Sequence, residues 1–373
     1  MTISIKTSRQ ISEIKDFWDA LLPEDHHLKL RHLSVFEKAM LPDIENYYLQ
    51  IFLKDKSIGL AYIQLFKFNH SHLNLEEPRT IQTCLIKAFL PGQLNFIICG
   101  NLFRINFQGF YFNNEQHNPH IFDVLEIFAD QNKKLNPVGI AVKDCETVFP
   151  ENKYTDFNYH FFSGDVTMEI TNRKHWLTFD DYLKDLTKKY FKRAIKIRQA
   201  FEGIRIKELD AAEILKNADK LERLYNNVLQ KQKAKLGTIN AAYLYELKTD
   251  LKENFELHAL YAGDILIGFY TYIFYDKEME THYIGLDYHY NTIHKTYFNI
   301  LFLSVQKMIE GKYERLELGR TAKEAKANLG AFPKQIFNYL KIKNPIARIV
   351  FTYFLKRFNN AENEKKLDRI PLK

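Results

Sequence analysis

Residues 255–276 read FELHALYAGDILIGFYTYIFYD, two runs rich in aromatic and aliphatic residues that a polar turn separates. Runs of this composition on both sides of a short turn predict a β-hairpin. Residues 48–68 read YLQIFLKDKSIGLAYIQLFKF and predict a second hairpin of the same kind. In each hairpin an Ile-Gly pair opens the second strand, at Ile58-Gly59 and at Ile267-Gly268.

The hairpin belongs to a series of elements that occurs twice along the chain. In both halves helices precede it, and a strand with a glycine, a helix and another strand follow it. The glycine-containing strands read NFIICGN and THYIGLD, the helices begin at Ile121 and Tyr297, and the later strands read PVGIAV and YERLEL. Each half then closes on a strand with the triplet Phe-Asn-Tyr, at residues 157–159 and 337–339. This repeated order indicates a duplicated unit.

The repeat predicts an α/β protein in which each of two tandem domains has a mixed (α+β) sheet. A chain of 373 residues is long enough to form two cores. We expect an N-terminal domain over residues 1–165 and a C-terminal domain over residues 166–342. A helix and a charged tail are expected over residues 343–373.

Composition and charge restrict the partners and the compartment. The net charge of +7 and the pI near 8.9 favour anionic partners, such as a nucleotide cofactor, RNA or lipid headgroups. Three cysteines far apart in the sequence provide neither a metal-binding spacing nor a disulfide framework. The first residues contain no apolar run typical of a signal peptide, and no apolar stretch is long enough to span a bilayer. We therefore expect a soluble, cytoplasmic protein without a metal.

The segment YERLELGRTAKEAKANLGAFPKQ, residues 313–335, predicts a strand that breaks at Gly319-Arg320 and a short helix over 322–329. Thr321 and Glu324 have the spacing of a capping box, and Gly330 suits the left-handed position after the last turn. The predicted helix has too little apolar surface to be explained as core. The start of this helix is either an anion site or an ordinary capped turn. The candidate ligands for an anion are Arg320, Thr321 and Lys326.

The strand over residues 279–287 carries the candidate catalytic groups. Strict alternation would point Glu280, His282, Ile284 and Leu286 to one face and Thr281, Tyr283, Gly285 and Asp287 to the other. His282 is a candidate base because histidine titrates near working pH, and Asp287 is a candidate for orienting an amine. The candidate proton donors are Tyr288, Tyr290 and Tyr297. With 22 tyrosines and 13 histidines in the chain, chance placement is the alternative.

The order of elements resembles the GNAT acyltransferase fold, and its duplication resembles the Fem-type branch, which includes peptidoglycan-bridge aminoacyl ligases. The residues that carry this resemblance lie in the second half: FDDYLKDLTKKYFKRAIKIRQAFEGIRIKEL, YIGLDYHY, LELGRT and LGAF. The resemblance implies that the fourth strand and the strand after the next helix diverge, and that a pantetheine or aminoacyl arm enters between them. It therefore implies donor or acceptor contacts at the end of the second strand, at Gly319, Arg320 and Thr321.

Further contacts follow from the same resemblance. The loop after the fourth strand would meet the donor through Tyr290, Asn291, Thr292 and Lys295. Substrate contacts are expected at Lys326, Glu280 and Tyr283. GNAT enzymes hold the pyrophosphate of coenzyme A with a glycine-rich loop at this place, but no glycine occurs here between residues 286 and 310. Bulky residues keep backbone N–H groups from closing on a phosphate, which disfavours coenzyme A.

The resemblance implies an acyl- or aminoacyltransferase with its site in the second half. The donor would be acyl-CoA or aminoacyl-tRNA, and the acceptor an amine or hydroxyl, for example of a cell-wall or lipid precursor. The first half reads AVKDCETVF where the second has Gly-Arg-Thr, so the first domain is expected to be supporting. One rival is a non-catalytic binding module for an anionic cell-wall or lipid precursor. A nucleic-acid-binding protein is the other.

Two helices have surfaces that suit partners. Residues 184–198 predict a basic helix with an apolar stripe, whose lysines suit the phosphates of tRNA or of a lipid-linked precursor. A solvated face is the alternative. Residues 344–358, NPIARIVFTYFLKRF, predict a helix with one apolar side, which suits peripheral contact with a membrane or docking on the protein itself, and we favour docking. The tail after residue 359 is charged and expected to be mobile.

Overall fold

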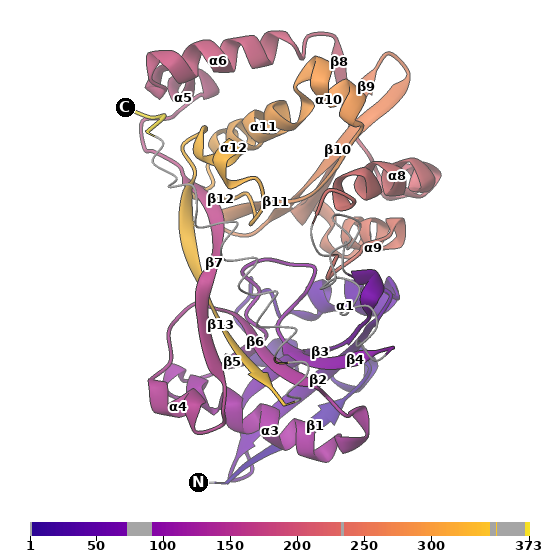
Figure 1. Ribbon diagram of the computed structural model, residues 1–373, viewed down its shortest axis with the longest axis vertical. Coiled ribbons are helices and arrows are strands. Elements are labelled where there is room, and N and C mark those ends of the chain that lie inside the picture. The colour runs from indigo at the N-terminus through magenta and orange to yellow at the C-terminus, as the bar shows by residue number, and fades with distance from the viewer. Residues whose placement is uncertain (1, 73–91, 233–234, 344–347, 349–369) are drawn as a thin grey trace, which may run out of the picture. The chain divides into compact units, whose positions relative to one another are not determined.

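The structure is a computed structural model, which describes residues 2–72, 92–232, 235–343, 348 and 370–373 (Figure 1). The chain forms two compact units. Unit 1 comprises Met1–Asp165, Lys233–Ile239 and Ile336–Glu364, and unit 2 comprises Val166–Gln232, Asn240–Gln335 and Lys365–Lys373. Each unit is a mixed sheet with helices packed on it, so the predicted α/β class is confirmed.

The sheet of unit 1 has the strand order β1-β2-β3-β4-β6-β13. Neighbouring strands are antiparallel, except that β4 and β6 are parallel. The short strand β5 pairs with β3 outside this order. The strands are β1 (Ile3–Ser8), β2 (Ile44–Leu53), β3 (Lys56–Phe68), β4 (Leu94–Cys99), β5 (Phe110–Phe112), β6 (Gly139–Cys145) and β13 (Phe332–Ile342). The described helices are α1 (Leu30–Lys38), α3 (Ile121–Gln131) and α4 (Glu151–Thr155).

Helix α3 connects the parallel strands of unit 1 and covers one face of the sheet. Its buried residues recur at intervals of three and four, which places them on one side of a helix. Phe122, Leu125 and Phe128 belong to one hydrophobic cluster with Ile63, Ile97 and Val142 of the sheet. The connection between parallel strands therefore provides the core of this unit.

The sheet of unit 2 has the strand order β7-β12-β11-β10-β9-β8, and only β11 and β12 are parallel. The strands are β7 (His160–Thr171), β8 (Ile204–Glu208), β9 (Phe255–Ala262), β10 (Ile265–Phe274), β11 (Glu278–Leu286) and β12 (Arg315–Glu317). The helices are α5 (Phe179–Asp185), α6 (Lys188–Gln199), α7 (Ala211–Lys216), α8 (Ala218–Leu229), α9 (Ala241–Leu251), α10 (Tyr288–His294), α11 (Thr296–Glu310) and α12 (Lys323–Ala327).

Helices cover both faces of the unit 2 sheet. On one face, α5, α6 and α11 share a hydrophobic cluster with the strands, in which Tyr182, Ile197 and Val305 take part. On the other face, the ring of Tyr225 in α8 and the ring of Tyr243 in α9 both contact Tyr283 of β11. The sheet is therefore the middle layer of three.

The two units repeat the same series of elements, as predicted. The hairpin β2/β3 corresponds to β9/β10, β4 to β11, α3 to α11, and β6 to β12. The closing strands, however, are exchanged. β7 follows unit 1 in the chain but pairs with β12 of unit 2, with Glu169 opposite Glu317. β13 pairs with β6 of unit 1, with Ile342 opposite Gly139, although residues 336–342 were expected in the second domain.

The predicted basic helix over 184–198 is wrong as a single element. α5 ends at Asp185 and α6 begins at Lys188. The break has a cause in tertiary structure: Leu186 forms a β-bridge with Leu372, and the Thr187 N–H donates to the Pro371 carbonyl at 2.8 Å. The helix predicted over 344–358 lies outside the described residues, except for Arg348. Residues 370–373 of the tail, by contrast, are bound to unit 2.

Candidate functional site

The site is built where two parallel strands stop pairing. β11 and β12 are paired only from Glu278–Arg315 to Glu280–Glu317. Beyond that point β12 follows β7 instead, because the Leu318 N–H donates to the Met168 carbonyl at 2.9 Å. The next residues of β11 therefore border a place where the ladder has ended, as the resemblance implied.

Three glutamates lie side by side on adjacent strands where this pairing ends. Glu169 of β7, Glu317 of β12 and Glu280 of β11 are register partners, so their side chains lie on the same face of adjacent strands. Like charges in this arrangement repel unless other groups compensate. Lys334 lies 3.6 Å from Glu169, the Thr167 hydroxyl and the Gly319 N–H donate to Glu317, and His282 pairs with Glu280.

His282 is held between an acid and a phenol. Its Nδ1 lies 2.6 Å from Oε1 of Glu280, and its Nε2 lies 2.9 Å from the hydroxyl of Tyr243. The side chains of His282 and Glu280 are 2% and 5% exposed. The carboxylate accepts from Nδ1, so in the neutral ring Nε2 is the acceptor and the Tyr243 hydroxyl donates to it. This arrangement can move a proton between Nε2 and Tyr243, while Glu280 stabilises the imidazolium.

Tyr243 was not among the residues predicted from sequence. It lies in the first turn of α9, where its N–H donates to Oδ1 of the capping residue Asn240 at 2.9 Å. Its side chain is fully buried. The cap fixes the start of the helix and so directs Tyr243 to the sheet. Because Tyr243 and His282 are far apart in the chain, no local sequence pattern connects them.

The predicted alternation along β11 holds through His282 and is wrong from Tyr283 onward. Thr281 faces α11, where its hydroxyl donates to Ser304 at 3.0 Å. The pairing with β10 then shifts between Tyr270 and Tyr272, and His282 and Tyr283 both face α9. Leu286 belongs instead to the cluster on the α11 side. The cause is a β-bulge, in which one extra residue turns the following side chains to the opposite face.

The segment after β11, which was predicted to be a loop, is the helix α10, and it satisfies its own backbone groups. Asp287 caps α10, and its Oδ1 accepts from the N–H of His289 at 2.9 Å and of Tyr290 at 3.4 Å. Asn291 Oδ1 accepts from the N–H of Tyr297 at the start of α11, at 2.8 Å. Thr292 donates to the Tyr288 carbonyl, and the left-handed Lys295 donates to the Thr292 carbonyl.

The residues of this segment that were predicted to bind the donor therefore bind other groups of the protein. The helix-start N–H groups of His289, Tyr290 and Tyr297 are bound by side-chain oxygens. The carboxylate of Asp287 occupies the position at the start of α10 that an anionic ligand would otherwise take. Tyr288 has its ring under Nζ of Lys231, 3.3 Å from the centroid, and burial raises the pKa of Tyr288. Asp287 and Tyr288 thus form part of the α10 cap, whereas His282 pairs with Glu280 and Tyr243.

The segment after β12 differs from the predicted capped helix. α12 covers only Lys323–Ala327, its N-cap residue Ala322 is left-handed with φ 52°, and no side chain caps it. The predicted capping box of Thr321 and Glu324 is therefore wrong. Gly330 does adopt the left-handed conformation, with φ 94°. Arg320 is half-buried and Thr321 is exposed.

Lys326 is not a surface ligand for an anion. Its side chain is buried, and Nζ donates to the Gly319 carbonyl at 3.0 Å. Burial, helped by Lys323 and opposed by Glu317, lowers the pKa of Lys326 to about 7. Lys326 therefore fixes the backbone at the end of β12, next to the glutamate row.

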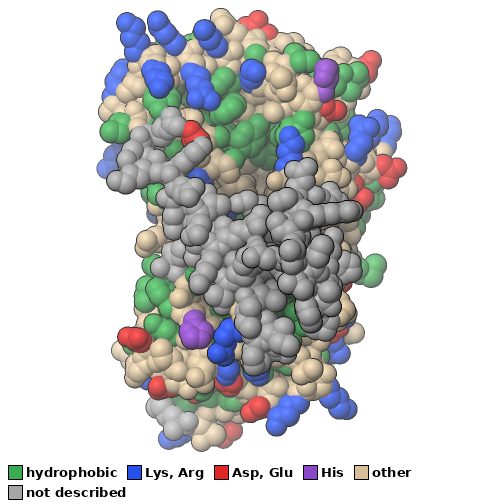
Figure 2. Space-filling model, viewed as in Figure 1, with side chains coloured by type: hydrophobic (Ala, Val, Ile, Leu, Met, Phe, Trp, Pro, Cys, Tyr) green, Lys and Arg blue, Asp and Glu red, His purple; other side chains and the backbone are tan. Residues whose placement is uncertain are grey.

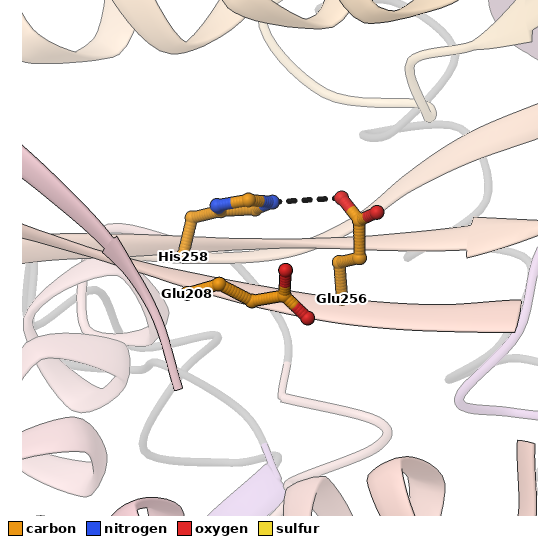
Figure 3. A group of neighbouring side chains, drawn as sticks. All are labelled: Glu208, Glu256 and His258. Atoms are coloured by element: carbon orange, nitrogen blue, oxygen red, sulfur yellow. Dashed lines mark hydrogen bonds and ion pairs between the residues drawn. The ribbon is translucent and has the colours of Figure 1, made fainter. Parts of the chain in front are cut away.

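A second charged cluster lies at the other edge of the unit 2 sheet, where Glu208, Glu256 and His258 come together (Figure 3). Lys248 donates to Glu208 at 2.7 Å, Lys307 donates to Glu256 at 2.7 Å, and His258 pairs with Glu256 at 2.8 Å. Burial raises the pKa of Glu256, but the bonds from His258 and Lys307 outweigh it and the pKa is lowered. Because each carboxylate has a cationic partner, the cluster is an ion-pair network that ties strands to helices.

Comparisons with known proteins agree with this architecture. No protein-family model matches the chain, and no curated protein matches it. Solved structures do match it over most of their length, and FemX and a tandem GNAT protein are two of them. The structure of FemX has a TM-score of 0.54 at 11% identity and covers 92% of this chain and 99% of its own. A tandem GNAT protein from the clavulanic acid biosynthesis pathway has a TM-score of 0.53 at 10% identity, with coverages of 92% and 99%.

The chain has the tandem GNAT fold. At these identities the likeness concerns the fold, and the chemistry has to be argued from the residues. In this chain the β11–β12 junction belongs to the second copy of the repeated unit and bears Glu280, His282 and Glu317. Within the described part of the chain, no helix has both the length and the hydropathy to cross a membrane.

Proposed function

We propose that unit 2 is a GNAT-type acyltransferase in which His282 is the general base. The observation that carries the proposal is the buried Glu280–His282–Tyr243 chain at the point where β11 and β12 stop pairing. Imidazole paired with a carboxylate is a common arrangement for removing a proton from a nucleophile. The end of the β11–β12 pairing supports an acyl-transfer reaction here, because the resemblance to the GNAT fold implies that the donor arm enters between these two strands.

In the proposed reaction, the acceptor is an amine or hydroxyl, for example of a cell-wall or lipid precursor. Its proton passes through the Tyr243 hydroxyl to Nε2 of His282, and Glu280 stabilises the resulting imidazolium. The nucleophile forms a bond to the donor's acyl carbon. The bond from that carbon to the donor's sulfur or ribose oxygen breaks, and the leaving group takes up the proton. Glu280 is a positioning residue in this scheme.

The donor is acyl-CoA or aminoacyl-tRNA, both of which are cytoplasmic. The caps formed by Asp287 and Asn291 argue against a pyrophosphate bound at the start of α10 or α11. A donor whose phosphates lie elsewhere suits the site better. The anionic partner is either tRNA or a lipid-linked precursor. Arg320 at the end of β12 is the remaining candidate for contact with the donor.

The test uses the purified chain with a series of acyl-CoA species or aminoacyl-tRNA and an amine acceptor, and measures donor consumption. His282→Ala should lower kcat/KM by about 10² to 10⁴, the usual contribution of a general base. The variant should still show donor-induced thermal stabilisation. His289→Ala is a matched control, because His289 is an exposed histidine in α10. Full turnover by His282→Ala would refute the assignment.

A second candidate function is a non-catalytic binding module for an anionic precursor. The bound N–H groups of His289, Tyr290 and Tyr297 favour it, because they are not available to the phosphates of a nucleotide donor. In that case a cell-wall or lipid precursor should raise the melting temperature, while no donor is consumed. Stabilisation by a donor, followed by turnover, would favour the enzyme instead.

A further inference from the structure

Helix α6 presents a dense set of cations to solvent. The segment Lys188–Gln199 contains no acidic residue. Its six cations are all exposed, and none forms an ion pair with a described residue: Lys188, Lys189, Lys192, Arg193, Lys196 and Arg198. Figure 2 shows Lys and Arg side chains gathered where Figure 1 places α6. Like charges on successive turns repel each other, so the surface suits an external anion.

The arginines and lysines of α6 face different surroundings. The guanidinium of Arg193 lies 5.0 Å from the ring centroid of Phe298, and that of Arg198 lies 4.7 Å from the ring of Phe179. Lys188, Lys192 and Lys196 recur every four residues, about 6 Å apart along the axis. They are opposite the buried residues Ala194 and Ile197. The outermost part of the helix is therefore a row of lysines.

Large apolar side chains accompany this lysine row. Phe191, within α6, is 38% exposed, while Leu177 and Ile370 are 80% and 81% exposed. The contact between Arg198 and Phe179 brings the start of α5, and so Leu177, near the last turn of α6. The bond from Thr187 to Pro371 brings Ile370 near the first turn of α6. Exposed hydrophobic residues therefore lie along α6 and at both of its ends.

We propose that α6, together with Leu177, Phe191 and Ile370, is a contact surface for an anionic lipid bilayer. Lysines near such a surface attract its headgroups, and exposed aliphatic and aromatic side chains gain by entering the interface. RNA would use the lysines but would leave Leu177 and Ile370 in water. In addition, the arginines, which suit phosphate recognition best, are turned to aromatic rings of the protein.

The contact is shallow and mainly electrostatic. The apolar stripe of α6 is buried in unit 2, with Ala194 and Ile197 nearly inaccessible, so the helix cannot insert by its own apolar face. Only the exposed side chains of Leu177, Phe191 and Ile370 enter the interface. Binding therefore requires negative lipids and weakens with salt. This inference holds whether or not unit 2 is catalytic.

The test is co-sedimentation of the full chain with vesicles of equal parts phosphatidylglycerol and phosphatidylcholine, or of phosphatidylcholine alone. We expect binding to the anionic vesicles at about 50 mM salt, loss of binding at about 500 mM salt, and no binding to the neutral vesicles. The triple variant Lys188→Gln, Lys192→Gln, Lys196→Gln should lower partitioning roughly 100-fold, at about fivefold for each lysine.

A matched control removes the same charge elsewhere in unit 2. Lys216, Lys220 and Lys252 are exposed and lie outside α6, so their change to Gln should leave most of the binding intact. The pair Leu177→Ser and Ile370→Ser should weaken partitioning but keep its salt dependence. All of these side chains are exposed, so thermal unfolding should be unchanged.

Three results would overturn the proposal. The first is no binding of the wild-type chain to anionic vesicles at low salt. The second is an equal loss of binding in the control triple variant. The third is an α6-dependent increase in anisotropy of a labelled RNA without any vesicle binding, which would identify α6 as a nucleic-acid surface.

Discussion

A buried lysine lies next to the candidate site. Lys326 donates to the Gly319 carbonyl at 3.0 Å, and Glu317 accepts from the Gly319 N–H at 2.7 Å. The carbonyl and the N–H of Gly319, at the end of β12, are therefore both bound by side chains. Gly319 has φ 87°, a backbone conformation that residues with a side chain rarely adopt. Sequence alone suggested a charged ligand at Lys326, because a lysine in a short polar helix is usually exposed.

The depressed pKa of Lys326 makes stability depend on pH. In the folded state its pKa is about 7, against an ordinary lysine pKa of 10.5 in the unfolded chain. Between these pH values the unfolded chain binds a proton that the folded chain does not, so stability from this residue rises as pH rises. Below pH 7 Lys326 is charged in the folded state, and the burial of this charge lowers the free energy of unfolding by its full amount. Lys326→Met should remove a slope of up to about 1.4 kcal/mol per pH unit in this window.

This prediction is checked by urea unfolding of the wild type and of Lys326→Met at several pH values from about 6 to 10. The variant should gain most, relative to the wild type, at the lowest pH. Lys216→Met, a change at an exposed lysine, serves as control. Parallel pH profiles for the wild type and Lys326→Met would contradict a lowered pKa.

The candidate site could be predicted in part at this scale. Glu280 and His282 lie two residues apart on one strand, so an acid–imidazole pair on one face follows from strand geometry. Their partner Tyr243 could not be found, because it comes from a helix that reaches β11 only through packing. Asp287 has a signal that the prediction misread: an aspartate just before a helix is a typical N-cap, and the structure uses it as one.

At the scale of elements, the end of the glycine-containing strand differs between the copies. In unit 1 a Cβ on Gly109 would lie 2.1 Å from the Gly100 nitrogen and 2.7 Å from the Cys99 carbonyl carbon. The Tyr62 N–H also donates to the Gly109 carbonyl at 2.7 Å. The chain before β5 therefore packs directly on the end of β4. In unit 2 the equivalent strand continues into the bulge with His282.

Gly109→Ala should consequently destabilise unit 1 strongly. The contacts are with backbone atoms of a buried strand end, which cannot move aside as a flexible side chain can. We expect a loss of about 3 kcal/mol or more, measured by urea unfolding. Gly92→Ala is the control, since a Cβ there has no atom within 4 Å. Equal stability of the two variants would mean that the strand end and the loop are not in contact.

At the scale of the whole molecule, exchange of the closing strands prevents a simple division of the chain. β6 of unit 1 has β13 as its neighbour, and β13 comes from the end of the chain. Tyr339 in β13 is fully buried, its hydroxyl accepts from the Phe149 N–H at 2.8 Å, and its ring lies 5.3 Å from Phe122. Unit 1 therefore depends on residues that follow nearly all of unit 2 in the sequence.

A fragment of residues 1–165 should fail to form a stable unit. It would lack β13 and would leave one edge of the inner strand β6 unpaired, with apolar surface exposed. We expect no cooperative urea transition for this fragment. Addition of a peptide covering residues 332–343 should restore part of the transition, whereas the same peptide with Tyr339→Ser should not. A cooperative transition of the fragment alone would show that β13 is dispensable.

The sequence by itself determined the duplicated series of elements, because hydrophobic alternation and turn residues act locally and fix strands, helices and their order. It also identified His282 and Glu280 as neighbours on one strand. Only the tertiary structure decided which strand closes which sheet, where the bulge turns Tyr283 to the face of His282, that Tyr243 meets His282 there, and that Lys326 is buried. These features arise from contacts between residues far apart in the chain, which no local periodicity records.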